Sequence, residues 1–157
     1  MQECQNSEQI TTMLRSHVER ALQGIWEQSV LITDDDGDYP FKSQTAMCWV
    51  SVVGGDQPTV RVFAHAALGV PSTKKMLAEI VELNGRSRWA KVTWCHGIVL
   101  VDQSIHWLSV DQSALERAIE SVMVVSDDIG TMLAAVYGGT TPFPLDSESE
   151  DSEQDAA

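Results

Sequence analysis

Basic residues are scarce in this sequence. Ten lysines and arginines stand against 23 aspartates and glutamates, which gives a formal net charge of −13. The last twelve residues hold six acids and no base, and the remaining chain, with 17 acids and ten bases, still carries −7. Such a surface repels phosphate backbones and anionic lipid head groups, so we expect no nucleic acid and no membrane as partner. A basic peptide or protein is favoured instead.

Cysteine is also rare, and long apolar runs are missing. Cys4, Cys48 and Cys95 are odd in number and show no CxxC spacing, which predicts reduced thiols rather than a disulfide framework. No charged-then-apolar leader opens the sequence, and its apolar runs fall well short of the about 20 residues of a membrane span. We therefore expect a cytoplasmic protein, and its 157 residues predict one domain.

Motifs of catalytic and phosphate-binding sites are absent, since no GxSxG, HExxH, P-loop or GxGxxG occurs. Gly54-Gly55 is followed by Asp-Gln-Pro and not by a helix, which indicates a turn. Cys95 and His96 are neighbours on a predicted strand and point to opposite faces, so they do not form a nucleophile–base pair. We expect no catalytic residue, no cofactor and no enzyme activity.

Two patterns resemble metal sites without completing them. The acidic turn Asp34–Asp38 looks like half a calcium loop, but its sixth and twelfth positions lack the required glycine and glutamate. Cys48, Cys95 and His65 show no structural-zinc spacing. A surface turn and small buried thiols are therefore favoured, so we expect no metal, and a metal or thiol enzyme built on these three residues is the minor alternative.

The periodicity of the apolar residues predicts an α+β fold. Helical spacing covers 8–26, 72–84 and 111–137, and strand patterns cover 29–33, 39–41, 45–53, 59–66, 89–95 and 98–102. Together they predict an antiparallel sheet of about five strands with helices packed on one face. Residues 8–144 form the domain, between a flexible N-terminus (1–7) and a disordered acidic tail (145–157).

Local signals place the helix ends. Ser72 or Thr73 is the expected N-cap of the second helix, and Asn84-Gly85 its expected end. Ser113 and Glu116 have capping-box spacing at the start of the last helix. A break in that helix is considered near Ser126–Asp128.

Aromatic and basic residues are the candidates for partner contacts. Tryptophan is favoured where one side of the ring is buried and the other is wet, as at interfaces, although a core position is the simpler reading for most of the five. A solvated loop is likewise the simpler reading of the basic residues beside Lys91, which otherwise offer a docking point for acidic groups. The candidate contacts are Ile25, Trp26, Tyr39, Phe41, Arg86, Arg88, Trp89 and Trp107.

Several segments resemble a known family. They are Asp36–Pro40, Phe63–Pro71, Leu83–Val92, Gly97–Val101 and Ser126–Gly130, and together they are similar to actinobacterial domains of the YbjN type, within the wider type III secretion chaperone-like fold. The resemblance covers roughly 8–144, and the Leu83–Val92 segment is its most specific part.

The resemblance implies the element order α-β-β-β-α-β-β-α, which the residue patterns also give. It further implies a non-enzymatic chaperone or adaptor, often homodimeric, that holds an extended protein or peptide client across apolar grooves and sheet edges. A secreted or toxin-like protein is one candidate client. The alternative is a regulatory or structural interaction domain within a larger complex.

Overall fold

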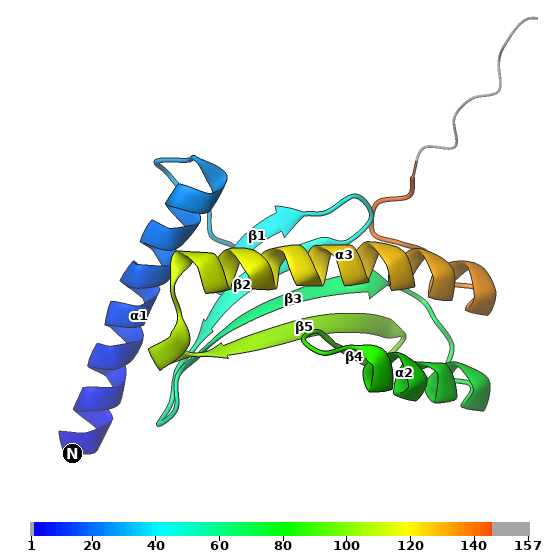
Figure 1. Ribbon diagram of the computed structural model, residues 1–157, viewed down its shortest axis with the longest axis horizontal. Coiled ribbons are helices and arrows are strands. Elements are labelled where there is room, and N and C mark those ends of the chain that lie inside the picture. Colours follow the sequence, from blue (N-terminus) through cyan, green and yellow to red (C-terminus); the bar gives the residue numbers. More distant parts are fainter. Residues whose placement is uncertain (1, 146–157) are drawn as a thin grey trace, which may run out of the picture.

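The computed structural model describes residues 2–145, as one five-stranded sheet and three α-helices. Along the chain lie α1 (Gln2–Trp26), β1 (Tyr39–Lys42), β2 (Met47–Val53), β3 (Thr59–Ala67), α2 (Lys74–Arg86), β4 (Lys91–Cys95), β5 (Ile98–His106), the 3₁₀ helix η1 (Trp107–Ser109) and α3 (Gln112–Tyr137). The predicted α+β class and element order are confirmed (Figure 1). The predicted tail lies outside the described residues, apart from Leu145.

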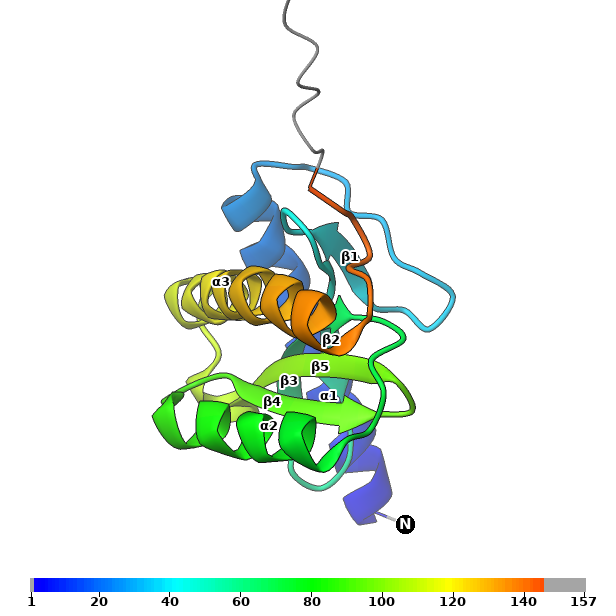
Figure 2. The same ribbon diagram turned by 90° about the vertical axis from the view of Figure 1, so that its right-hand side faces the viewer.

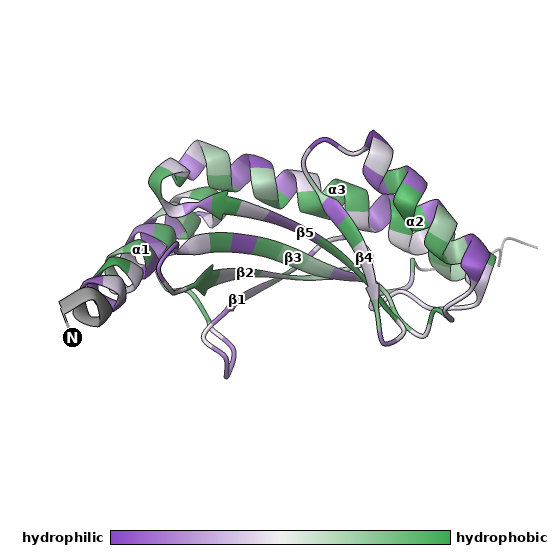
Figure 3. Cartoon of the chain, turned by 90° about the horizontal axis from the view of Figure 1, so that it is seen from below, coloured by the Kyte–Doolittle hydropathy of each residue, from purple (hydrophilic) through white to green (hydrophobic). Residues whose placement is uncertain are grey.

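The sheet is antiparallel throughout, in the order β1-β2-β3-β5-β4. Because side chains alternate between faces, the register sends one set of small apolar residues to the face beneath α3. This set forms the core of the sheet and comprises Cys48, Val50, Val52, Val60, Val62, Ala64, Val92, Val99 and Val101. Figure 3 shows α3 above this face and no helix of the described chain on the opposite face.

Two residues in the middle of α3 fix the helix on the sheet. Gly130 lies so close to β3 that an added Cβ would stand 2.2 Å from the Ala66 carbonyl oxygen. One helical turn earlier, Oδ1 of Asp127 accepts hydrogen bonds from Ser43 Oγ (2.6 Å), Thr45 N (2.9 Å) and Thr45 Oγ1 (2.8 Å) in the β1–β2 connection. The helix is thus held both by close packing and by a polar anchor.

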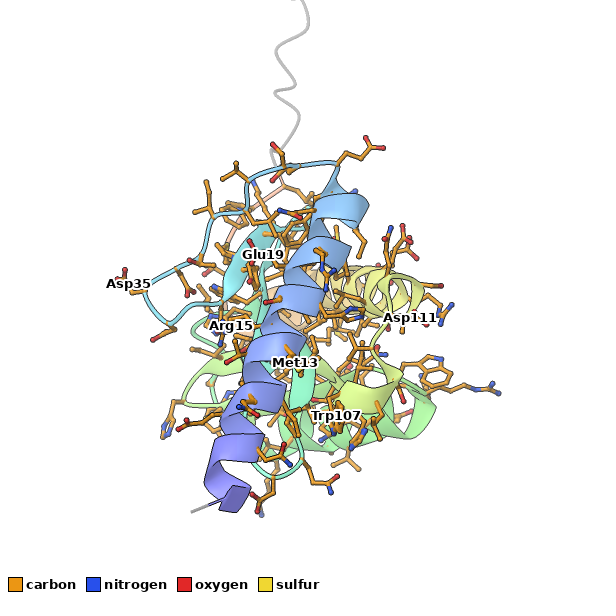
Figure 4. All side chains as sticks on the ribbon, turned by 90° about the vertical axis from the view of Figure 1, so that its left-hand side faces the viewer. Met13, Arg15, Glu19, Asp35, Trp107 and Asp111 are labelled. Carbon is orange, nitrogen blue, oxygen red and sulfur yellow. The ribbon has the colours of Figure 1, made fainter. Side chains whose placement is uncertain are left out.

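The other two helices lie at the margins of the sheet. α2 runs beside β4, as Figure 2 shows. α1 crosses one end of the strands, with Trp107 and Asp111 on one side and Arg15 and Glu19 on the side of the Asp35 loop (Figure 4). An Arg15 Nη1 hydrogen bond to the Gly37 carbonyl, 2.9 Å long, ties α1 to that loop.

Several expected boundaries differ from the structure. α1 begins at Gln2 rather than near residue 8, and residues 29–33 form no strand. The N-cap of α3 is Asp111, which accepts from Ala114 N, and not Ser113, because the helix begins one residue before that serine. α3 runs through Ser126–Asp128 without a break. The N-cap of α2 is Thr73, one of the two predicted residues.

Candidate functional site

A groove of about 860 Å³ lies between the first half of α3 and the last residues of β5. We call it the α3–β5 groove. Ile105 of β5 forms part of its floor, Val124 and Val125 of α3 form one wall, and Trp89 stands at its rim. Val124 is 60% exposed and Trp89 is 72% exposed, so large apolar surfaces face solvent here. A groove with this lining suits apolar side chains of a partner.

The strand beside this groove has a free edge. β4 pairs with β5 from Ile98 to Asp102, and within the described chain no strand pairs with Gln103–His106 on that side. The reason is that β4 begins only at Lys91, so that the preceding residues leave the sheet. A free edge offers main-chain donors and acceptors to an added strand.

Asn84 shows which main-chain groups face that edge. Its side-chain amide brackets Val92 of β4: Asn84 Nδ2 donates to the Val92 carbonyl, and Val92 N donates to Asn84 Oδ1, both at 2.7 Å. Val92 therefore turns its main chain away from β5. In an antiparallel strand the main-chain N–H and C=O groups of neighbouring residues point to alternate sides. The main-chain groups of Lys91 and its partner Asp102 therefore point toward each other, and the next β5 residue whose main chain points to this side is Ser104.

This role of Asn84 corrects the sequence interpretation of Asn84-Gly85 as a helix end. α2 continues to Arg86 and is capped by Ser87, whose N–H donates to the Leu83 carbonyl. Asn84 instead binds the outer edge of β4. Its planar side-chain amide satisfies the Val92 N–H and carbonyl, as a neighbouring strand would.

A buried acceptor lies next to the α3–β5 groove, on the lining residue Gln103. Gln103 Oε1 is buried and has no hydrogen-bond donor among the described residues. An unsatisfied buried amide oxygen costs about 1–3 kcal/mol, and a rotation of the Gln103 side chain toward the groove would let a ligand donor satisfy it. Apolar walls, a free strand edge and an unsatisfied acceptor thus occur together.

A second groove, of about 580 Å³, lies on the other side of α3, and we call it the α1–β1 groove. Ile25 and Trp26 from the end of α1 meet Phe41 of β1, and the Trp26 and Phe41 ring centroids are 5.5 Å apart. Glu120 of α3 lines both grooves, so the first half of α3 forms a ridge between them.

The candidate contacts chosen from the sequence are thus distributed over several places. Trp89 lies at the α3–β5 groove and Arg88 beside it. Arg86 forms an ion pair with Glu82 on the exposed side of α2. Tyr39 is only 3% exposed and belongs to the core, and Trp107 packs partly against the core.

Sequence reasoning missed the apolar wall of the α3–β5 groove. Val124 and Val125 follow the buried Val122, but Val124 lies off the buried stripe of α3. An apolar residue off the stripe of an amphipathic helix is a usable signal, because a solvated face normally carries polar residues. Gln103 gives no such signal. It is a polar residue in a strand, and only the packing of α3 on the sheet buries its side chain.

The residues considered for a metal or thiol site are not assembled. Cys48 points to the α3 face of the sheet, whereas His65 and Cys95 point to the opposite face. Burial raises the pKa of the Cys48 thiol to about 11, which keeps it protonated at neutral pH. Over the part of the chain that the structure describes, no three His, Cys, Asp or Glu residues are grouped to hold a metal ion. Nor is any helix of that part long and apolar enough to cross a membrane.

Solved structures with a similar fold share little sequence with this chain. A chain of the HopA1–SchA chaperone–effector complex is 16% identical with a TM-score of 0.56, covering 74% of this chain and 94% of its own. A chain of the ExsC–ExsE complex is 11% identical with a TM-score of 0.58, covering 81% and 95%. A chain of the Yersinia pestis type III secretion chaperone SycH, solved with a fragment of YscM2, is 13% identical with a TM-score of 0.54. The match covers 76% of this chain and 98% of that chain.

A comparison with curated proteins finds no match. The family model of the T3SS (YopN, CesT) and YbjN peptide-binding chaperone 1, TY-Chap1, matches residues 12–145. This match spans most of the chain and confirms the resemblance to YbjN-type chaperone domains that the sequence segments showed. The chain therefore belongs to the TY-Chap1 family of peptide-binding chaperones.

Proposed function

We propose that this protein is a chaperone that holds an extended segment of a client protein in the α3–β5 groove. The observation that carries the proposal is the free edge of β5 at Ser104, directly beside an apolar groove that Gln103, with its unsatisfied Oε1, helps to line. An extended segment satisfies all three features, since it pairs with the strand edge and sends alternate side chains into the groove.

The described relatives support a protein client. One similar fold was solved in a chaperone–effector complex and another as a secretion chaperone with a protein fragment. A secreted or toxin-like client is part of our proposal, as is a cytoplasmic location with Cys48 and Cys95 as free thiols. Binding rather than catalysis is the activity we propose.

Val124→Glu is expected to weaken client binding by tenfold or more. A charge on the groove wall would have to be desolvated by each apolar side chain that enters, and a tenfold loss corresponds to about 1.4 kcal/mol. Peptides selected from a random phage-displayed library on the wild-type protein provide the ligand, and fluorescence polarisation measures their dissociation constants.

Val136→Glu is the matched control. Val136 lies on the same helix, is similarly exposed at 57%, and does not line the α3–β5 groove. Equal weakening by both substitutions, or selection of no peptide, would argue against the groove. A regulatory or structural domain that binds only folded partners is the alternative, and it predicts that no extended peptide is selected and that aggregation of a model client is not suppressed.

We further propose that the chaperone acts as a homodimer through the outer side of α2. Leu77 (41% exposed) and Val81 (71% exposed) are one helical turn apart and form an apolar stripe. Leu77→Glu with Val81→Glu is expected to halve the mass measured by light scattering after size exclusion. Leu108→Glu, at a 72% exposed position in η1, is expected to leave the dimer intact. A monomeric wild-type protein would contradict this assembly.

A further inference from the structure

The connection between α2 and β4 lies in line with the free edge of β5. β4 begins at Lys91, which is opposite Asp102. Two steps further along the same register, Trp89 would lie opposite Ser104. The main-chain groups of an antiparallel strand alternate, so the N–H and the carbonyl of Trp89 would then both point toward Ser104. The chain thus carries its own candidate for the place that a client strand would take.

Ala90 already lies beside the strand. Its side chain is only 4% exposed, and its carbonyl accepts a hydrogen bond from Ser87 Oγ. Asn84 Nδ2 donates in the same way to the Val92 carbonyl at the outer edge of β4. Carbonyls two residues apart point to the same side of an extended strand, so the Ser87 bond is compatible with a longer β4. Only residues 88–89 therefore have to move to lengthen it.

The fold holds Arg88 and Trp89 weakly. Both are exposed, Trp89 at 72%, and both form bends. Within residues 2–145 the Trp89 N–H donates no hydrogen bond, so a movement of this residue breaks none there. Helix–strand connections of about two residues are common, and Ser87 and Arg88 would still join α2 to the longer strand.

This pairing would carry the indole ring to the other side of the sheet. Lys91 points away from α3, and strand alternation places Trp89 on the same side. There it would lie across the small Ser104 from Arg61, whose guanidinium is 4.8 Å from the centroid of the Phe63 ring. A guanidinium beside an indole face is favourable. The α3–β5 groove would at the same time lose the aromatic residue at its rim.

We propose that residues 88–89 are a strap that pairs with Ser104 and closes the α3–β5 groove when no client is bound. The structure holds the open state, in which the edge of β5 is free. This inference rests on the proposed client site, because the strap and a client strand compete for the same main-chain groups of Ser104. A client must displace the strap, so segments that pair poorly with β5 are rejected.

Hydrogen exchange of the Ser104 amide, measured by NMR on the full-length protein without client, tests the pairing. In the open state this amide faces the free edge and exchanges like that of an unstructured chain, whereas the closed state protects it. We expect the wild-type amide to exchange about threefold more slowly than an unstructured chain, or slower still. Trp89→Pro is expected to remove most of this protection, because proline has no N–H and does not fit inside a paired strand.

Trp89→Ala is the matched control, because it removes the indole but keeps the N–H. Its Ser104 amide is expected to exchange about twofold more slowly than that of Trp89→Pro, or slower still. The Asp102 amide, on the residue that pairs with Lys91, is the internal reference and should behave alike in all three proteins. A wild-type Ser104 amide that exchanges like an unstructured chain, or equal rates in the two variants, would overturn the strap. The wild-type measurement needs no substitution and stays decisive where a variant does not fold.

A disulfide across the pair tests the competition with clients. Trp89→Cys with Ser104→Cys sets two thiols at opposed positions, where Cα atoms about 5.5 Å apart suit a disulfide. Cys4 and Cys95 are changed to serine, and Cys48 stays buried. We expect the oxidised variant to bind phage-selected peptides about tenfold more weakly than the same variant after reduction.

The two measurements separate the strap from the client site. A cysteine pair that does not oxidise, or oxidation that leaves peptide affinity unchanged, would overturn the strap as a competitor. Failure to select any peptide would contradict the proposed client site instead, and the exchange of the Ser104 amide would still decide whether the strap pairs with β5.

Discussion

Gly130→Ala is expected to lower the free energy of unfolding by about 3 kcal/mol, as severe overpacking does. The added Cβ would lie 2.2 Å from the Ala66 carbonyl oxygen and 2.8 Å from its carbonyl carbon, and both are backbone atoms that no rotamer change can move. α3 must therefore shift away from β3 by about 1 Å to reach an ordinary C···O contact of about 3.3 Å. Urea denaturation of the purified variant measures the loss.

Gly85→Ala is the matched control, because it is the same substitution in another helix. Nothing lies within 4 Å of a Cβ at Gly85, and its φ is not positive. Alanine there is expected to raise stability by about 0.5–1 kcal/mol, since it restricts the unfolded chain. A Gly130 variant as stable as the wild type would show that α3 does not approach β3 as closely as described.

Asp127→Ala is expected to cost about 3–4 kcal/mol and to loosen the β1–β2 connection. Ser43 and Thr45 are 6% and 2% exposed, and both lose their carboxylate acceptor. Hydrogen bonds to a charged group contribute about 1.5–3 kcal/mol each, and buried donors left without an acceptor add their desolvation cost. Asp127→Asn keeps one oxygen for the Ser43 and Thr45 donors and is expected to lose about half as much.

The effect of Asp127 depends on pH in a defined direction. Burial alone would raise the pKa of this carboxyl, but the hydrogen bonds from Ser43, Thr45 and Gln44 outweigh burial and hold the pKa below its usual range. A lowered folded-state pKa stabilises the protein fully above the unfolded value of about 3.9, and this contribution is lost as the pH falls through the folded value. The stability gap between wild type and Asp127→Ala should therefore narrow below about pH 4, and a gap independent of pH would contradict the anchor.

Much of the fold could be predicted from residue patterns because the signals are local. Apolar spacing identified all three helices, and the His96-Gly97 turn was recognisable because glycine accepts the left-handed backbone found there, with φ of 47° at His96 and 85° at Gly97. The Ser29–Thr33 run misled because Val30 and Ile32, typical of strands, are 77% and 80% exposed. β-branched residues favour a strand only where a neighbour strand and a buried face are available.

The α3–β5 groove could not be predicted from the sequence, because it depends on a difference in strand length. The pattern placed Trp89 and Ala90 in β4, yet the chain leaves the sheet before Lys91, where the Ser87 hydroxyl donates to the Ala90 carbonyl. That departure frees the edge of β5 and exposes Trp89. The α1–β1 groove was more accessible to prediction, because Ile25, Trp26 and Phe41 are large apolar residues at the ends of their elements.

The start of β4 at Lys91 sets the size of what this protein can recognise. A strand added beside Ser104 lies in line with β4, so it cannot continue past Asp102, where β4 already pairs with β5. The free stretch Gln103–His106 is four residues, about 13 Å, long. We therefore expect this protein to recognise client motifs of about four residues with two apolar side chains on one side. Motifs this short occur often enough for one chaperone to bind several proteins.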